Sequence, residues 1–145
     1  MNILELVKVR QTFAADRLTD IEGAVHSEIE RIAAPIRPGD RIAITAGSRG
    51  IANLARIVRA VVEELKSRGA EPFIVPAMGS HGGATAQGQA DLLAGYGITE
   101  AAVGAPVRSS MEVVELPRGE LEHPVYQDRL AHEADGIVVL NRVKV

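Results

Sequence analysis

Two glycine-rich loops, each lying between an apolar segment and an amphipathic one, constrain the fold of this chain most strongly. Residues 41–46 (RIAITA) have the pattern of a short buried strand, and the loop 47–50 (GSRG) follows them. Residues 72–78 predict a second such strand, which is followed by the loop 79–83 (GSHGG). Strands that alternate with helices across short loops predict a parallel sheet covered by those helices.

Other segments extend this alternating pattern. Apolar residues recur at helical spacing over 20–34, where Thr19 and Glu22 predict a capping box, and over 51–68. Helices are also expected from Thr85 to about residue 96 and over 130–134, and strands over 4–13, 111–116 and 136–143. Residues 97–110, rich in small side chains, predict an irregular segment. We therefore expect one α/β domain with a Rossmann-like, mostly parallel open sheet of about five strands and helices on both faces.

Composition narrows the function classes. The chain has 145 residues, the size of one ordinary domain, and a net charge of −3. With two Phe, two Tyr and no basic excess, it offers neither a charged face nor a stacking platform for nucleic acid. The lack of cysteine excludes disulfides, thiolate metal sites and cysteine nucleophiles. No apolar run predicts a membrane span or signal peptide, so we expect a cytoplasmic protein that acts on a small molecule.

The first loop predicts an anion-binding turn. Ligands of open α/β sheets bind beyond the carboxyl ends of the strands, where this loop is expected. Gly47 and Gly50 allow positive φ and close backbone approach, and a helix N-terminus follows them. Arg49 offers a guanidinium group suited to a carboxylate or phosphate. The alternative is a tight strand-to-helix turn with its arginine in solvent; the dinucleotide and P-loop patterns are both absent.

The second loop predicts an acid/base group. His81 stands among three glycines at a strand end, which leaves space for a substrate, and imidazole titrates near neutral pH. The alternative is a histidine that hydrogen bonds its own loop. Ser80 next to His81 does not predict a serine hydrolase, because adjacent side chains seldom face each other and no G-x-S-x-G elbow exists.

The remaining titratable residues predict no further site. The other histidines are scattered, with no pair at helical spacing, so no metal site is expected. The acidic residues near the C-terminal third predict a solvated rim: Glu112, Glu115, Glu120 and Glu122.

Three segments, taken in order, resemble the N-terminal domain of the nickel-pincer lactate racemase family: 44–51 (ITAGSRGI), 78–85 (MGSHGGAT) and 134–144 (ADGIVVLNRVK). The resemblance implies racemisation or epimerisation of a 2-hydroxy acid. In that family a nickel-pincer nucleotide accepts the Cα hydride while a histidine removes the hydroxyl proton. By position, His81 corresponds to one of two acid/base histidines. The resemblance also implies that five loop residues bind substrate or cofactor: Ser48, Arg49, Gly50, Gly79 and Ser80.

The chain departs from the family pattern in two places. The family has D-x-T-R at the first loop, whereas this chain has Ala46 and Ser48 before Arg49, which favours a 2-hydroxy acid other than lactate. The family also continues past a segment like 141–144 with a second acid/base histidine, a tethering lysine and a nickel-ligating histidine. We therefore expect residues 1–145 to be the N-terminal part of a longer two-domain enzyme truncated after Val145.

Such a fragment is expected to be inactive and to retain no cofactor, its main partner being the missing C-terminal domain. Association with a second copy through an exposed sheet edge is also expected. From the residues alone, an alternative stays open: a non-catalytic Rossmann-like module that binds a nucleotide or phosphate.

Overall fold

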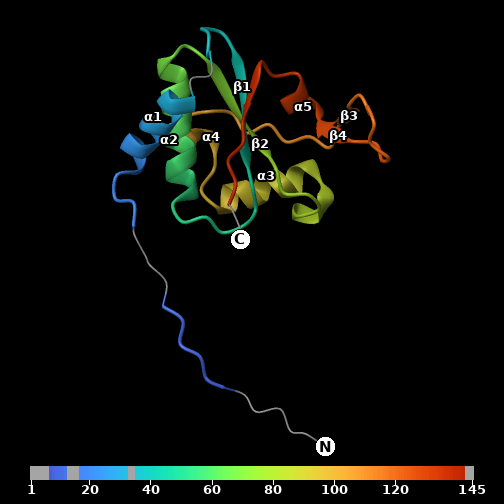
Figure 1. Ribbon diagram of the computed structural model, residues 1–145. Coiled ribbons are helices and arrows are strands. Elements are labelled where there is room, and N and C mark those ends of the chain that lie inside the picture. The colour runs from blue at the N-terminus through green and yellow to red at the C-terminus, as the bar shows by residue number, and fades with distance from the viewer. Residues whose placement is uncertain (1–6, 13–16, 33–34, 143–145) are drawn as a thin grey trace, which may run out of the picture.

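The computed structural model describes residues 7–12, 17–32 and 35–142, which form a mixed α/β fold (Figure 1). Its centre is a parallel sheet of three strands in the order β2-β1-β5. These strands are β1 (Arg41–Ala46), β2 (Glu71–Pro76) and β5 (Gly136–Val138). Ile44 of β1 lies opposite Ile74 of β2 and Val138 of β5. The α/β class and the parallel central sheet are thus confirmed.

Alternating side chains of β1 and β2 divide the core into two clusters, as the period of a strand requires. Ile42 and Ile44 of β1 and Ile74 of β2 point to one face of the sheet and are buried there. Ala43 and Phe73 point to the opposite face and belong to a second, smaller cluster. Because both faces of these strands are covered, the segments read as continuous apolar runs.

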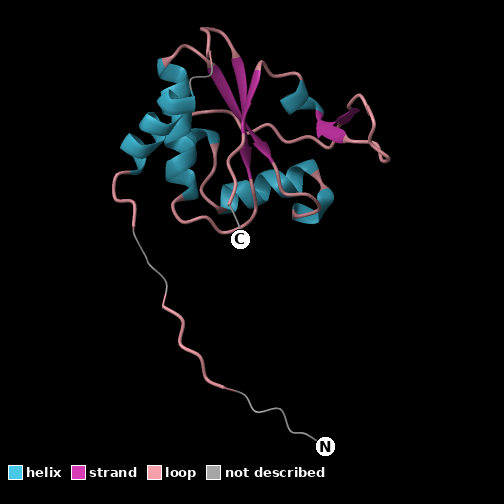
Figure 2. Ribbon diagram, in the orientation of Figure 1, coloured by secondary structure: helices cyan, strands magenta, loops and turns pink. Residues whose placement is uncertain are grey.

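Most helices pack on the first face. The helices are α1 (Ile21–Ile32), α2 (Leu54–Ser67), α3 (Ala86–Gly95), α4 (Glu100–Val103) and α5 (Arg129–His132), with a short 3-10 helix η1 (Gly82–Ala84) before α3. Helix α2 buries a stripe spaced at helical intervals against the sheet, and α1 lies along its outer side (Figure 2). That stripe is Leu54, Val58, Val61, Val62 and Leu65.

The second face has much less cover. Among the described helices, only α5 contributes a buried residue there, Ala131, which packs with Ala43, Phe73 and Val75. The Phe73 ring is bordered by two guanidinium groups, whose carbons lie 5.9 Å (Arg41) and 5.0 Å (Arg108) from its centroid. Both distances suit cation–π attraction.

Helix ends follow the sequence signals in most cases. Gly69 after α2 has φ +83°, as a C-terminal glycine should, and the Thr85 side chain accepts a hydrogen bond from the Gly88 N–H. The capping box expected at Thr19 is wrong. Asp20 takes that place, because its Oδ1 accepts from the Gly23 N–H at 2.9 Å.

The expected sheet of about five strands is corrected to three. Residues 7–12 are extended and pair with no described strand, and the rest of the segment 4–13 lies outside the described residues. The strand expected over 111–116 is β3 (Val113–Glu115), which forms a separate antiparallel pair with β4 (Tyr126–Asp128). β4 is polar and short, so its sequence carries no strand pattern, and pairing with it keeps β3 out of the central sheet.

Two further segments differ from expectation. β5 ends at Val138 rather than 143, because the Leu140 N–H donates to the Thr45 hydroxyl at 3.0 Å instead of continuing the ladder. The irregular segment 97–110 contains α4, and Val107 then forms a single parallel bridge to Ile74 at the outer edge of β2. The connection thus partly covers that edge of the sheet.

An ion pair between α1 and α2 predicts a pH-dependent part of the stability. His26 Nδ1 and Glu64 Oε2 are 2.9 Å apart, and this contact, with the Glu64 charge, raises the pKa of His26. A raised folded-state pKa stabilises the fold below the unfolded value of about 6.5, and this contribution is lost as pH rises through the folded value. The effect is small, because the His26 side chain is more than half exposed.

We expect the thermal midpoint of the native chain to fall relative to that of His26→Gln as pH rises from about 6 to 8. Circular dichroism melts across this range measure the difference. His123→Gln, in the loop between β3 and β4, is the matched control and should keep the native pH dependence. Identical pH profiles for the native chain and His26→Gln would contradict the assignment.

Candidate functional site

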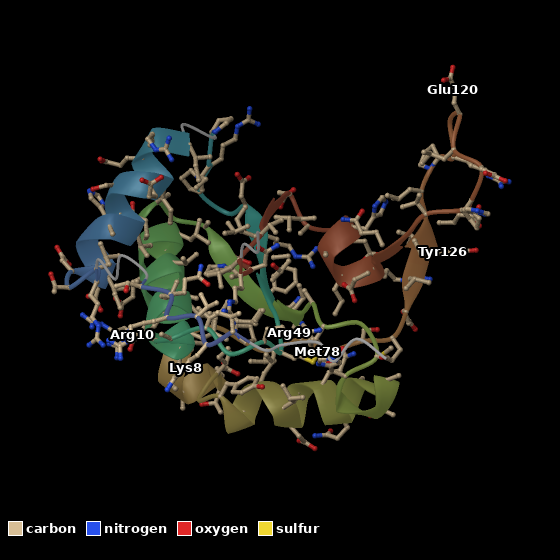
Figure 3. The ribbon with its side chains drawn as sticks, turned by 60° about the horizontal axis from the view of Figure 1, so that its bottom comes forward. Lys8, Arg10, Arg49, Met78, Glu120 and Tyr126 are labelled. Carbon is tan, nitrogen blue, oxygen red and sulfur yellow. The ribbon has the colours of Figure 1, made fainter. Side chains whose placement is uncertain are left out.

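The two glycine-rich loops meet at the carboxyl ends of β1 and β2. Ser48, in the first loop, shares a hydrogen bond with His81, in the second, through its Oγ and the imidazole Nδ1. The strands hold the loops together, since the Ala77 N–H donates to the Ala46 carbonyl at 2.8 Å. His81 therefore bonds across to the neighbouring loop, and its exposed ring lies at this edge of the sheet. In Figure 3, the labelled residues Arg49 and Met78 mark the two loops.

Two residues that the sequence analysis did not select hold these loops in place. The Tyr96 hydroxyl, at the end of α3, donates to the Ser48 carbonyl at 2.7 Å. Gln89 is only 5% exposed, and its Nε2 donates to the Gly79 carbonyl at 2.8 Å and the His81 carbonyl at 3.3 Å. The only signal for Gln89 was its position four residues before the buried Leu93, on the inner face of α3.

The glycines of the second loop are required by its backbone. Gly79, Gly82 and Gly83 have φ of +61°, +64° and +68°, a region that other residues rarely adopt. Gly82 also packs directly on the first turn of α3, where a Cβ on Gly88 would lie 2.0 Å from the Gly82 carbonyl oxygen. The loop that carries His81 is thus built by backbone-to-backbone contact.

The first loop is built differently. Gly47 and Gly50 allow positive φ, but neither residue adopts it. The left-handed residue is Asn53, with φ 60°, three residues later, and α2 begins at Leu54 rather than 51. The chain bends at Ser48 and Arg49, between the two glycines, without a left-handed residue. Gly47 still lies close to the second loop, since a Cβ there would be 3.6 Å from the Ala77 carbonyl oxygen.

A small hollow of about 160 Å³ lies beside the first loop. It brings in the third segment of the resemblance, because Asn141 and Arg142 line it together with Ser48 and Arg49. The two arginines are exposed, and the described residues that line the hollow include no carboxylate. A hollow of this kind favours a small anion.

A second hollow, of about 380 Å³, lies on the other side of Arg49. Its lining includes Gly50, Tyr96 and the first turn of α2, where Asn53 makes no side-chain cap. Arg56 also lines it, but its guanidinium donates two 2.6 Å hydrogen bonds to Glu22, which lowers the pKa of that carboxyl.

The other expected binding residues lie in different surroundings. Gly79 and Ser80 line neither hollow and are occupied within their own loop, where the Ser80 carbonyl accepts from the Ala84 N–H at 3.2 Å. Ala46 is fully buried in the core, so this position contributes no group to the crevice.

Two properties of the described residues bear on metal binding and on membrane insertion. Within 7–12, 17–32 and 35–142, no three His, Asp or Glu side chains are grouped to hold a metal ion. None of the helices in these ranges has the length and apolar character needed to cross a bilayer.

The chain was compared with protein-family models, with curated proteins and with solved structures, and none of them matches it.

Proposed function

We propose that the hollow lined by Ser48, Arg49 and Arg142 binds a small 2-hydroxy acid and that His81, which is hydrogen-bonded to Ser48, exchanges a proton with the hydroxyl group of this acid. The observation that carries the proposal is the Ser48–His81 hydrogen bond beside a hollow with two arginines and no carboxylate. This arrangement supports the proposal because a 2-hydroxy acid has a hydroxyl group that suits an imidazole and a carboxylate that suits a guanidinium group.

Arg49 and Arg142 bind the carboxylate of the 2-hydroxy acid in this proposal. A guanidinium group binds a carboxylate through two parallel N–H···O bonds, and Arg49 and Arg142 lie on the same hollow. Its volume of about 160 Å³ is below the range of roughly 300–1,000 Å³ typical of drug-sized ligands, so an acid with few carbons fits best.

Ser48 determines which imidazole nitrogen of His81 carries the proton. When neutral His81 donates its Nδ1 proton to Ser48 Oγ, Nε2 keeps its lone pair. That nitrogen then accepts the hydroxyl proton of the acid and returns it after the reaction. Because Gln89 and Tyr96 hold the two loop backbones, the Ser48–His81 pair is positioned before a ligand arrives.

The resemblance to the nickel-pincer lactate racemases supports racemisation or epimerisation as the overall reaction. In such a reaction the nickel-pincer nucleotide supplies the hydride acceptor. The described residues do not fit that group by themselves, because they contain no cluster of nickel ligands. The family also tethers the cofactor through a lysine, whereas the amine of Lys66 donates to the Gly104 carbonyl, beyond the C-terminal end of α4. The described residues supply the acid/base and carboxylate-binding parts of such a site.

We expect NMR titration of the chain to show that D- or L-lactate, 2-hydroxybutyrate or malate shifts the resonances of His81, Ser48 and Arg49. Arg49→Gln should weaken binding by about 10- to 100-fold, the effect of losing a hydrogen bond to a charged group. His81→Gln should remove the preference for lactate over propionate, which lacks the hydroxyl. Arg118→Gln, in the loop between β3 and β4, is the matched control and should bind normally.

Two outcomes would overturn the proposal: no site-specific shift with any of the acids, or shifts that neither Arg49→Gln nor His81→Gln changes.

A phosphate-binding module is the second candidate, and the larger hollow at the start of α2 favours it. Inorganic phosphate in the same titration distinguishes the two functions. Phosphate binding that shifts Gly50, Asn53 and Ala55 while leaving His81 unaffected would select the phosphate module.

A further inference from the structure

We propose that residues 7–12 of one chain add as a strand to the free edge of β5 in a second copy, so that two chains exchange their N-terminal segments. The inference joins two features that the proposed function does not use. One is an apolar groove along β5, and the other is an extended segment whose valines lie in solvent.

The groove, called here the edge groove, has a volume of about 410 Å³ and lies where the central sheet ends. β5 is the last strand in the order β2-β1-β5, so one side of its backbone is unpaired among the described strands. Apolar side chains from α1, from the connection to β1 and from β5 form its walls: Ile29, Ile32, Ile36, Ile137, Val138 and Val139. Of these, Val139 is 70% exposed and Ile32 is 67% exposed.

The segment 7–12 has the pattern of a strand with one apolar side. Val7 and Val9 alternate with Lys8 and Arg10, so the two valines share one face of an extended chain. Each valine is 81% exposed. Figure 1 shows this segment extended and directed away from the sheet of its own chain. The orientation therefore favours a groove on another copy over the groove of the same chain.

Segment and groove carry opposite charges, which attract the two at long range although the basic side chains lie on the side of the segment away from the valines. The ionisable lining residues of the edge groove are Asp40 and Asp135. Their Oδ2 atoms accept from backbone N–H groups, at 2.7 Å from Arg37 and 2.8 Å from Arg41, and each carboxylate has a second oxygen. Lys8 and Arg10 bring two positive charges on the polar face of the segment. Backbone pairing to β5 then places Val7 and Val9 against the groove walls.

Exchange of residues 7–12 in both directions gives a closed dimer. Each copy has one segment and one groove, so a two-fold axis satisfies both and leaves neither the segment nor the β5 edge free for a third copy. The interface is small, and we expect a dimer with a Kd on the order of 1–100 μM that weakens with salt.

Cysteine cross-linking tests the contact, because the chain has no native cysteine. One sample mixes a Val9→Cys chain with a Val139→Cys chain of different mass, under mild oxidation. We expect a covalent heterodimer of the two chains. The matched control pairs Val9→Cys with Leu121→Cys, an exposed residue between β3 and β4, and should give only background cross-linking.

Sedimentation analysis gives an independent readout. The native chain should change from monomer to dimer as its concentration rises, and the exposed double variant Val7→Asp, Val9→Asp should stay monomeric while keeping the native circular dichroism. Equal cross-linking in the test and control mixtures would overturn the proposal. So would a native chain that is monomeric at every concentration, or a Val9→Cys, Val139→Cys chain that closes its disulfide only within one molecule.

Discussion

Replacing Gly88 by alanine is expected to destabilise the fold by about 2–4 kcal/mol and to displace the loop that carries His81. The new Cβ would lie 2.0 Å from the Gly82 carbonyl oxygen and 2.8 Å from Thr85 Oγ1. The first contact is with backbone, which cannot move aside without breaking the loop. The second disturbs the hydrogen bond by which Thr85 caps α3. Both effects act on the same turn, so the loss combines overpacking with a weakened cap.

Gly95→Ala is the matched control, since Gly95 lies in the same helix and a Cβ there meets nothing within 4 Å. We expect it to be neutral or to stabilise the protein by up to about 1 kcal/mol, the helix-propensity gain of alanine over glycine. Urea unfolding measures both free energies. The NMR resonances of His81 and Ser48 report on the loop, and they should move in Gly88→Ala alone. Equal free energies of unfolding for the two variants would show that the loop tolerates a side chain.

Replacing Phe73 by alanine is expected to destabilise the fold by about 3–5 kcal/mol. Phe73 is 2% exposed and is the largest residue of the cluster on the second face of the sheet. In the described part of the chain, α5 alone covers that cluster, with Ala131, so few neighbouring side chains can move in to fill the space. The change would also leave Arg41 and Arg108 without the ring that they border.

Two further variants separate packing from the cation–π contribution. Phe73→Leu keeps most of the volume and should cost less than about 2 kcal/mol. Arg108→Ala keeps the ring and should cost about 0.5–1 kcal/mol, the usual size of an exposed cation–π contact. Chemical denaturation provides the three values. If Phe73→Ala cost no more than Arg108→Ala, the second face would not be a packed core.

The elements that the sequence predicted well are those whose signals are local. The strands at Arg41–Ala46 and Glu71–Pro76 are apolar runs, and helix α2 is a long amphipathic segment, so each is recognisable without its neighbours. Thr85 and Gly69 act on adjacent backbone groups, and both were found where expected. The meeting of the two loops followed from the parallel order of the strands, because their carboxyl ends must share one edge.

The misplaced elements depended on distant partners. Whether Val113–Glu115 joins the central sheet or a separate pair depends on Tyr126–Asp128, a polar segment without a strand pattern of its own. At the site, Gln89 and Tyr96 were missed because their roles exist only once α3 packs beneath the loops. A glutamine or a tyrosine in a helix does not by itself indicate that its side chain holds a neighbouring loop.

In the first glycine-rich loop, residue type alone did not predict the backbone conformation. Glycine at positions 47 and 50 permits a left-handed backbone but does not require it, and the chain takes that conformation at Asn53 instead. At Gly82 and Gly88 the need for glycine is real, yet its cause is contact between two backbones six residues apart. Local pattern thus determined β1, β2, the main helices and the two loops that carry Ser48 and His81. Packing between segments distant in the sequence decided the number of strands in the sheet and the residues that hold the site, because those contacts form only when the chain is folded.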